Sequence, residues 1–393
     1  MFNKRFIPLL LIGVVALVSG CNSAPSVNDP LRTDALDAIA EQAASDGFPG
    51  VVIAMSEAPN IVVTGAAGVS DRVSGTPMKP DDRIHAASTT KPFTAAAILR
   101  LWDEGALDLD ATLPDVLEPE IVDLVPNGDR ITVRDLLLHT SGIYSPNNDP
   151  DYLARYIGPE RLEKEFWSAR EIIAFAANPD NAPLFSPGDG QQYGDINYVL
   201  LSLVVENVSG RPFKEFVRSE IFERAGMQDT YFMSDDRDRS RARGYTVDSE
   251  ILRSIGLDPA LTADSLGLID TTDAQEQSDG AAGVITTAPD LVRFANAFLK
   301  GDLISLKSRQ FVLAVAELAD EEDEALGVLR AYRTQAGVVV AAEGDGPGTN
   351  VLWAMDMETG KIAAIGVTLF GRWDENDYMF GEMLPAVFEA QSP

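Results

Sequence analysis

A serine and a lysine three residues apart, Ser88 and Lys91, form the pair in this sequence best suited to chemistry. The apolar residues that follow recur with the 3.6-residue period of an α-helix: Phe93, Ala96, Ala97 and Leu101. This pattern places Ser88 at a helix start, where serine is a favoured cap and backbone N–H groups are unpaired. Because residues i and i+3 share a helix face, we expect the Lys91 amine to lie beside the Ser88 hydroxyl.

This spacing predicts nucleophilic attack on a carbonyl group. A hydroxyl needs a neighbouring base for such an attack, and helix N–H groups can stabilise the oxyanion that results. The alternative is a serine that only caps the helix, followed by a solvated lysine.

Other catalytic chemistries have little support in the sequence. The only histidines are His85 and His139, and there is no Gly-x-Ser-x-Gly motif, which argues against a Ser-His-Asp hydrolase of the α/β type. With two histidines and the single cysteine Cys21, the chain offers few ligands for zinc. No phosphate-binding glycine-rich loop is evident. We therefore expect no cofactor and no metal.

Strands and helices at both ends of the chain bracket a mainly helical middle. At the N-terminal end, a helix is expected to begin at Thr33 and end at Gly47, followed by a hairpin of two strands at 51–55 and 61–65. Towards the C-terminus, a turn or short strand and a helix are expected within 283–301, strands at 338–342, 351–356 and 361–370, and a closing helix at 380–390.

This order predicts an α/β (α+β) fold with a single antiparallel sheet. Both ends of the chain would build the sheet, helices would flank it, and residues 100–240 would form an inserted helical lobe. We expect one domain over 33–393, with the active site in the cleft between sheet and lobe.

Residues 1–20 have the pattern of a secretory signal peptide, with Lys4 and Arg5 before an apolar run that is too short to span a membrane. The run ends in Leu-Val-Ser-Gly-Cys, which resembles the lipobox of bacterial lipoproteins. Cys21 is then expected to be the lipidated first residue of the mature chain, with 21–32 as a tether. This predicts anchoring in the cell envelope, facing the periplasm or the exterior; the alternatives are an uncleaved anchor and plain secretion.

The net charge of −30 makes nucleic acid or anionic lipid a poor partner. The predicted partners are a small-molecule or peptide substrate and the membrane that holds the lipid. The sequence does not indicate an oligomeric state.

Five blocks in order resemble the serine hydrolases of the β-lactamase and penicillin-binding superfamily. They are the 84–99 block with Ser88 and Lys91, and residues 101–117, 131–143, 185–210 and 280–301. The resemblance is closest to the branch that holds class C β-lactamases, D-alanyl-D-alanine carboxypeptidases and related esterases. It implies the β-lactamase/transpeptidase-like fold and an acyl-enzyme at Ser88.

The family's second motif is Tyr-x-Asn, and Tyr193-Gly194-Asp195 occupies its place. The resemblance makes Tyr193 the partner that shares proton transfer with Lys91. Asp195 departs from the motif, because an ionised Asp can only accept hydrogen bonds. It would also favour the protonated form of a nearby lysine and so weaken Lys91 as a neutral base. Asp195 would either face a cationic or hydrogen-bond-donating substrate group or lie in a surface loop.

The third motif is Lys-Thr-Gly or His-x-Gly, and here the matching residues are Ala342-Glu343-Gly344. In the family this cation helps to hold a substrate carboxylate, so its loss argues for neutral esters or amides, or for amine-bearing peptides. Arg330 or Arg333 is the alternative source of a cation. By resemblance, a backbone N–H near Asp345 completes an oxyanion hole with that of Ser88.

The sequence thus predicts a serine hydrolase of small esters, amides or peptides. A D-alanyl-D-alanine carboxypeptidase or β-lactamase is the alternative within this class. A cell-envelope binding protein that has kept the cleft but lost the chemistry is the alternative outside it.

Overall fold

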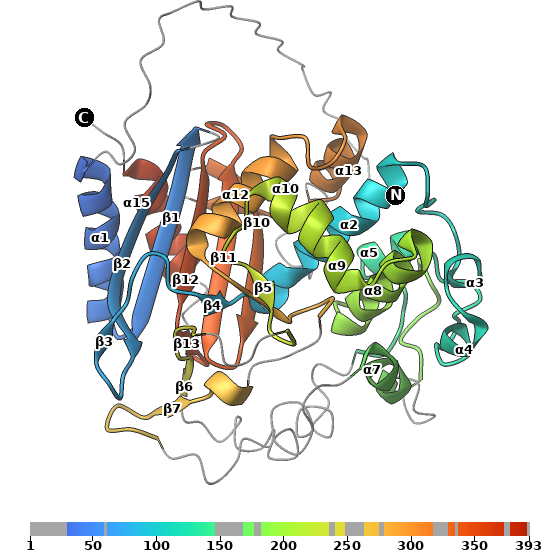
Figure 1. The fold of residues 1–393 in the computed structure, drawn as a ribbon, viewed down its shortest axis with the longest axis horizontal. Helices are drawn as coiled ribbons and strands as arrows, with labels where there is room; N and C mark the ends of the chain where they lie inside the picture. The colour runs from blue at the N-terminus through green and yellow to red at the C-terminus, as the bar shows by residue number, and fades with distance from the viewer. Residues whose placement is uncertain are drawn as a thin grey trace, which may run out of the picture.

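A seven-stranded sheet joins the two ends of the chain, in the order β3-β2-β1-β12-β11-β10-β9 (Figure 1). The N-terminal end supplies β1 (Gly50–Ala58), β2 (Ile61–Asp71) and β3 (Thr76–Pro77). The C-terminal end supplies β9 (Arg330–Thr334), β10 (Gly337–Gly346), β11 (Thr349–Asp356) and β12 (Ile362–Val367). The two parts meet where β1 pairs antiparallel with β12, which confirms the predicted sheet.

The computed structural model describes residues 30–58, 61–145, 168–176, 182–235, 240–247, 263–274, 279–316, 329–334, 337–372 and 378–390. The predicted signal peptide and Cys21 lie outside these ranges, as does most of the predicted tether. Within them, no helix is long and apolar enough to cross a membrane.

Helices cover both faces of the sheet, so its central strands are continuous buried runs (Figure 1). One face packs against α1 (Pro30–Ser45) and α15 (Leu384–Glu389), the latter continuing from a π-helical turn at Met379–Met383. The other face packs against α12 (Ala288–Leu299) and α2 (Lys91–Asp103). Helix α1 begins three residues before the predicted Thr33, with a proline at a position where proline is favoured.

The predicted helical lobe is present in the described part of 100–240. It contains α3 (Leu113–Val116), α4 (Pro119–Val122), α5 (Val133–Leu137), α7 (Ala169–Ala176), α8 (Asp195–Ser209), α9 (Phe213–Val217), a π-helical turn (Arg218–Phe222) and α10 (Glu223–Ala225). A further helix outside the lobe is α13 (Leu306–Ala316).

Two small sheets lie beside the main one. One has the order β4-β8-β5 and comprises β4 (Ile84–His85), β5 (Tyr231–Phe232) and β8 (Val284–Thr286). The other has the order β13-β6-β7 and comprises β6 (Tyr245–Val247), β7 (Leu268–Asp270) and β13 (Leu369–Phe370).

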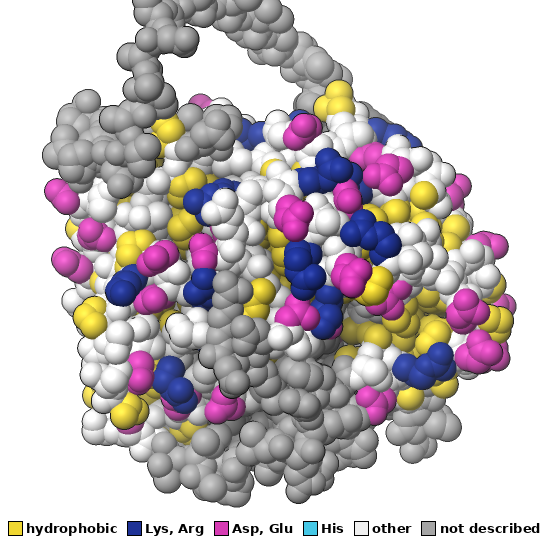
Figure 2. All heavy atoms as spheres, viewed as in Figure 1, with side chains coloured by type: hydrophobic (Ala, Val, Ile, Leu, Met, Phe, Trp, Pro, Cys, Tyr) yellow, Lys and Arg dark blue, Asp and Glu magenta, His cyan; other side chains and the backbone are white. Residues whose placement is uncertain are grey.

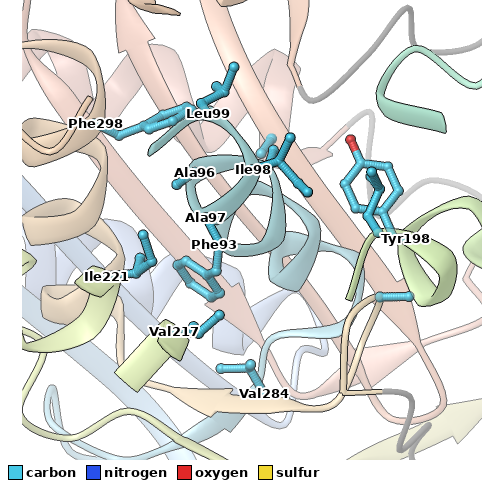
Figure 3. Packing of buried hydrophobic residues seen from close by; sticks show 14 of the residues in the cluster. Phe93, Ala96, Ala97, Ile98, Leu99, Tyr198, Val217, Ile221, Val284 and Phe298 are labelled. Atoms are coloured by element: carbon cyan, nitrogen blue, oxygen red, sulfur yellow. The ribbon is translucent and has the colours of Figure 1, made fainter. Parts of the chain in front are cut away.

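Helix α2 is enclosed between the sheet and the lobe. Its residues from Lys91 to Leu99 are all buried, which makes the buried surface broader than the single apolar face expected from the sequence. Phe93 packs edge-on against Phe222 of the lobe and Phe294 of α12, with ring centroids 5.3 and 4.6 Å away. Figure 3 shows Val217 and Ile221 of the lobe on one side of this helix and Phe298 of α12 beside it. The helix that carries Lys91 is therefore held from both sides.

Figure 2 shows basic and acidic side chains interspersed over the face of the molecule in view, with no large area of one sign. The surplus of acidic residues is thus spread among basic ones on this face.

Candidate active site

Ser88 lies in a 3₁₀ turn, Ala87–Thr90, that runs directly into α2. The α-helix therefore begins three residues after the predicted start at Ser88, and no side chain caps either the turn or the helix. The Lys91 N–H still donates to the Ser88 carbonyl oxygen, which keeps the two residues on one face. Ala87 has a φ of +46°, an unfavourable conformation for a residue with a Cβ, and marks the sharp entry into this turn.

The structure brings Ser88, Lys91 and Tyr193 into contact. The Lys91 ammonium donates to the Ser88 Oγ at 2.9 Å, and the Tyr193 hydroxyl donates to the same oxygen at 2.8 Å. Lys91 also donates to the Ala281 carbonyl oxygen at 3.2 Å. The nucleophile, amine and phenol expected from the sequence thus share one hydrogen-bonded cluster.

Asp195, the first residue of α8, forms a buried ion pair with Lys91. Its Oδ1 lies 2.5 Å from the Lys91 Nζ, and both side chains are only 4% exposed. The alternative that Asp195 lies in a surface loop is therefore wrong. A carboxylate at the first turn of a helix also interacts favourably with the helix dipole.

Both hydrogen-bond partners of Ser88 hold their protons at neutral pH. Burial lowers the pKa of Lys91, but the Asp195 carboxylate and the Tyr193 phenol outweigh it and bring the pKa above its ordinary value. Burial raises the pKa of Tyr193 to about 12, although the Lys91 charge opposes the rise. One of these groups must therefore lose a proton before it can accept the proton of Ser88.

His139 holds the segment that carries Tyr193. Its ring packs against that of Tyr193 with centroids 4.6 Å apart, and its Nδ1 accepts the Gly194 N–H at 3.3 Å. The Asn197 amide lies 3.0 Å from the same nitrogen. Burial and the Lys91 charge lower the pKa of His139 to about 3, so the ring stays neutral and can accept these hydrogen bonds. The family resemblance of the block 131–143 implies a structural role for His139, but nothing in the sequence indicates its contact with the phenol.

Gly344 brings strand β10 into backbone contact with the Ser88 turn. A Cβ at this position would lie 2.6 Å from the Ala86 carbonyl oxygen and 2.7 Å from the Ser88 nitrogen. The strand turns back into β11 through Pro347 and Gly348, and Gly348 has a φ of +88°. Only a residue without a side chain allows the strand to approach the nucleophile this closely.

Asp345 follows Gly344 on β10 and is exposed to solvent. Desolvation by the surrounding protein nevertheless raises the pKa of its carboxyl, and the Lys91 charge partly opposes this rise. Ala342, at the place of the missing cation, is 6% exposed and belongs to the apolar core.

Glu343 is paired with Arg330. The Arg330 Nη1 lies 2.9 Å from the Glu343 Oε1, and the Tyr332 hydroxyl donates to the same oxygen at 2.6 Å. Arg333 is exposed and pairs in register with Val338, further from this end of β10. Of the two arginines considered from the sequence, Arg330 is thus the one beside the third motif, where its charge is already compensated.

Gly344→Ala is expected to push the strand away from Ser88, because the new methyl group would meet backbone atoms. Phosphonylation of Ser88 by a fluorophosphonate should slow on the order of 100-fold, the size of effect seen when an oxyanion donor is lost. Mass spectrometry over a time course measures the rate. Gly381→Ala is the control, because a Cβ there meets nothing within 4 Å. An unchanged rate in Gly344→Ala would show that this close approach does not position the nucleophile.

A family model described as Beta-lactamase matches residues 36–385. Penicillin-binding protein 4* of Bacillus subtilis (strain 168) is 27% identical over 311 residues, covering 78% of this chain and 64% of that protein. Esterase EstB of Burkholderia gladioli is 32% identical over 210 residues, covering 52% of each. The chain thus spans about half to two thirds of the length of these curated relatives.

Among solved structures, the D-amino acid amidase of Ochrobactrum anthropi SV3 superposes with a TM-score of 0.76 at 22% identity, over 91% of this chain and 98% of that one. This similarity confirms the predicted β-lactamase/transpeptidase-like fold. Since the family model covers most of the sequence, the chain belongs to the beta-lactamase family.

Proposed function

We propose that this protein is a serine hydrolase that forms an acyl-enzyme at Ser88 and hydrolyses small neutral esters, amides or peptides. The observation that carries the proposal is the double contact of the Ser88 Oγ with Lys91 and Tyr193. Membership of the beta-lactamase family and similarity to a protein named as an esterase support it. The intact cluster also argues against the alternative of a binding protein that has lost its chemistry.

In the acylation step, the Ser88 Oγ attacks the carbonyl carbon and its proton passes to Lys91 or Tyr193, once that group has become deprotonated. The backbone N–H groups of Ser88 and Asp345 stabilise the oxyanion. When the bond to the leaving group breaks, the same proton passes to that group. Water then attacks the acyl carbon and gives up a proton to Lys91 or Tyr193; as the bond to the Ser88 Oγ breaks and the acid is released, that proton passes to the Oγ.

The charges around the cleft favour a neutral substrate. Ala342 supplies no cation, Asp195 compensates Lys91, and Glu343 compensates Arg330. A D-alanyl-D-alanine peptide or a β-lactam carries a carboxylate that would need a free cation. Carboxypeptidase or β-lactamase activity is therefore the second candidate within the proposed class.

Ser88→Ala should abolish both turnover of a nitrophenyl ester and adduct formation with a fluorophosphonate, because the nucleophile is absent. Tyr193→Phe should lower kcat by about 10²- to 10⁴-fold, the usual contribution of a proton-transfer group. Circular dichroism checks that both variants fold. A fluorophosphonate adduct without a labelled-penicillin adduct supports an esterase or amidase, whereas adducts with both support the second candidate. Unchanged turnover in Ser88→Ala would show that the nucleophile is another residue.

Asp195→Asn should shift the pH dependence of kcat/KM. The wild-type carboxylate keeps Lys91 protonated, so activity is expected to rise with pH in the alkaline range. In the variant, burial still lowers the pKa of Lys91 while the opposing charge is gone. The acidic limb measured with a neutral nitrophenyl ester should therefore move to lower pH by about one unit or more, each unit corresponding to about 1.4 kcal/mol.

Glu343→Gln serves as the matched control for this measurement, because it also removes a carboxylate from the cleft but not one that contacts Lys91. Its acidic limb should move less. An acidic limb that stays in place in Asp195→Asn would rule out Lys91 as the titrating base.

We further propose that Cys21 is lipidated and anchors the protein in the cell envelope. The signal-like residues 1–20 and the lipobox-like sequence before the single cysteine support this proposal. Cys21→Ser should move the protein, expressed with its leader in a bacterium, from the membrane to the soluble fraction, because the thiol that accepts the lipid is lost. Immunoblotting of the fractions measures this. Retention of the variant in the membrane would point to an uncleaved anchor.

A further inference from the structure

We infer that Glu343 acts as a built-in carboxylate that occupies Arg330 and so excludes substrates that carry a carboxylate within reach of Arg330. The inference rests on the proposed hydrolase activity and adds to it a residue that determines substrate charge. Neutral and cationic substrates are the class that this arrangement admits.

The pair lies at the edge of the sheet, where β9 begins. Arg330 pairs in register with Ala341, so β9 lies beside β10 only as far as Ala341, two residues before Glu343. The Arg330 guanidinium and the Tyr332 hydroxyl both bond to the Glu343 Oε1, at 2.9 and 2.6 Å. Glu343 thus receives a charged and a neutral donor at one oxygen, as a bound carboxylate ligand would.

The pair lies beside the strand that contacts the nucleophile turn. Glu343 directly precedes Gly344 on β10, where a Cβ would lie 2.7 Å from the Ser88 nitrogen. Side chains at successive strand positions point to opposite faces, so Glu343 reaches Arg330 at the strand edge while Gly344 faces Ser88. The charge of Arg330 also reaches the site, since it contributes to the low pKa of His139 and acts on the Asp345 carboxyl. A ligand bound to Arg330 would therefore lie beside the part of β10 that runs past the end of β9 and contacts the Ser88 turn.

Solvent reaches this pair, unlike the pair formed by Lys91 and Asp195. The side chains of Arg330 and Glu343 are 30% and 24% exposed, against 4% for each partner of the buried pair. A substrate carboxylate can approach Arg330, but it would have to displace Glu343 and leave that carboxylate without its cation. Like charges side by side oppose such binding, which is how a site rejects an unwanted ligand.

Removal of Glu343 would free the guanidinium. Arginine has a planar set of N–H donors that matches a carboxylate, and such charge-assisted bonds are among the strongest in proteins. Arg330 would then be free to bind anionic substrates. A single substitution is therefore expected to change which charge the cleft accepts.

The experiment compares two nitrophenyl esters with acyl chains of equal length, the hexanoate and the monoester of adipate. The adipate chain ends in a carboxylate and the hexanoate chain in a methyl group. In Glu343→Ala, the ratio of kcat/KM for adipate to that for hexanoate should rise by about tenfold or more, consistent with a new hydrogen bond to a charged group. In the double variant Glu343→Ala with Arg330→Gln, the ratio should return towards the wild-type value.

An unchanged ratio in Glu343→Ala would overturn the inference. An equal rise in the double variant would also overturn it, because the gain would then come from lost repulsion and not from Arg330. If Glu343→Ala does not fold, as judged by circular dichroism, Glu343→Gln takes its place.

Calorimetric binding of free adipate gives a readout that needs no turnover. Adipate should bind about tenfold more tightly to Glu343→Ala than to the wild type, and the gain should disappear in the double variant. If no variant hydrolyses either ester but this binding pattern appears, the proposed hydrolase activity fails while the role of Glu343 stands. Equal binding to all three proteins contradicts that role.

Discussion

The burial of the Lys91 ammonium is the constraint on which the arrangement of the site depends. A charge removed from water is costly unless other groups compensate it. Here Asp195, the Ala281 carbonyl oxygen and the Ser88 Oγ surround the amine, and each comes from a different segment of the fold. The compensation of one charge therefore ties the helical lobe, the loop before β8 and the turn before α2 together.

The same compensation sets the chemistry of the cleft. An ammonium held by a carboxylate is a weak base, so the proposed reaction depends on a proton leaving a group that the structure stabilises in its protonated form. Tyr193 faces a similar demand, since burial favours its neutral form. Two ion pairs, one buried and one at the edge of the sheet, leave the cleft with few uncompensated charges. This is the reason why we propose a neutral substrate.

Features with a local signal could be predicted from the sequence. The helical period after Lys91 was sufficient to place it beside Ser88, and short apolar runs were sufficient to locate five of the seven strands of the main sheet. The role of Tyr193 could be predicted only from the family motif, because a tyrosine distant in the chain has no local sequence signal for its contact with a serine. The effect of Asp195 on Lys91 was expected from the same motif, but the sequence has no signal for the direct, buried ion pair between them.

The pairing of Arg330 with Glu343 could not be predicted because it depends on strand register. Arg330 and Arg333 are an odd number of positions apart, so their side chains point to opposite faces of β9. Which of them reaches Glu343 is decided by how β9 aligns with β10, and a shift of one residue would exchange the faces. The exact start of the helix was mispredicted because a 3₁₀ turn precedes α2 without a capping side chain.

The backbone contact between Gly344 and the Ser88 turn makes the reactive centre dependent on the alignment of one hairpin. If β10 slipped by one residue against β11, a glutamate or an aspartate would be forced into the space that only a glycine fits. The two-residue connection at Pro347 and Gly348 opposes such a slip by fixing which residues of the two strands face each other. Errors in the folding of this hairpin would thus inactivate the protein even where the rest of the sheet had formed correctly.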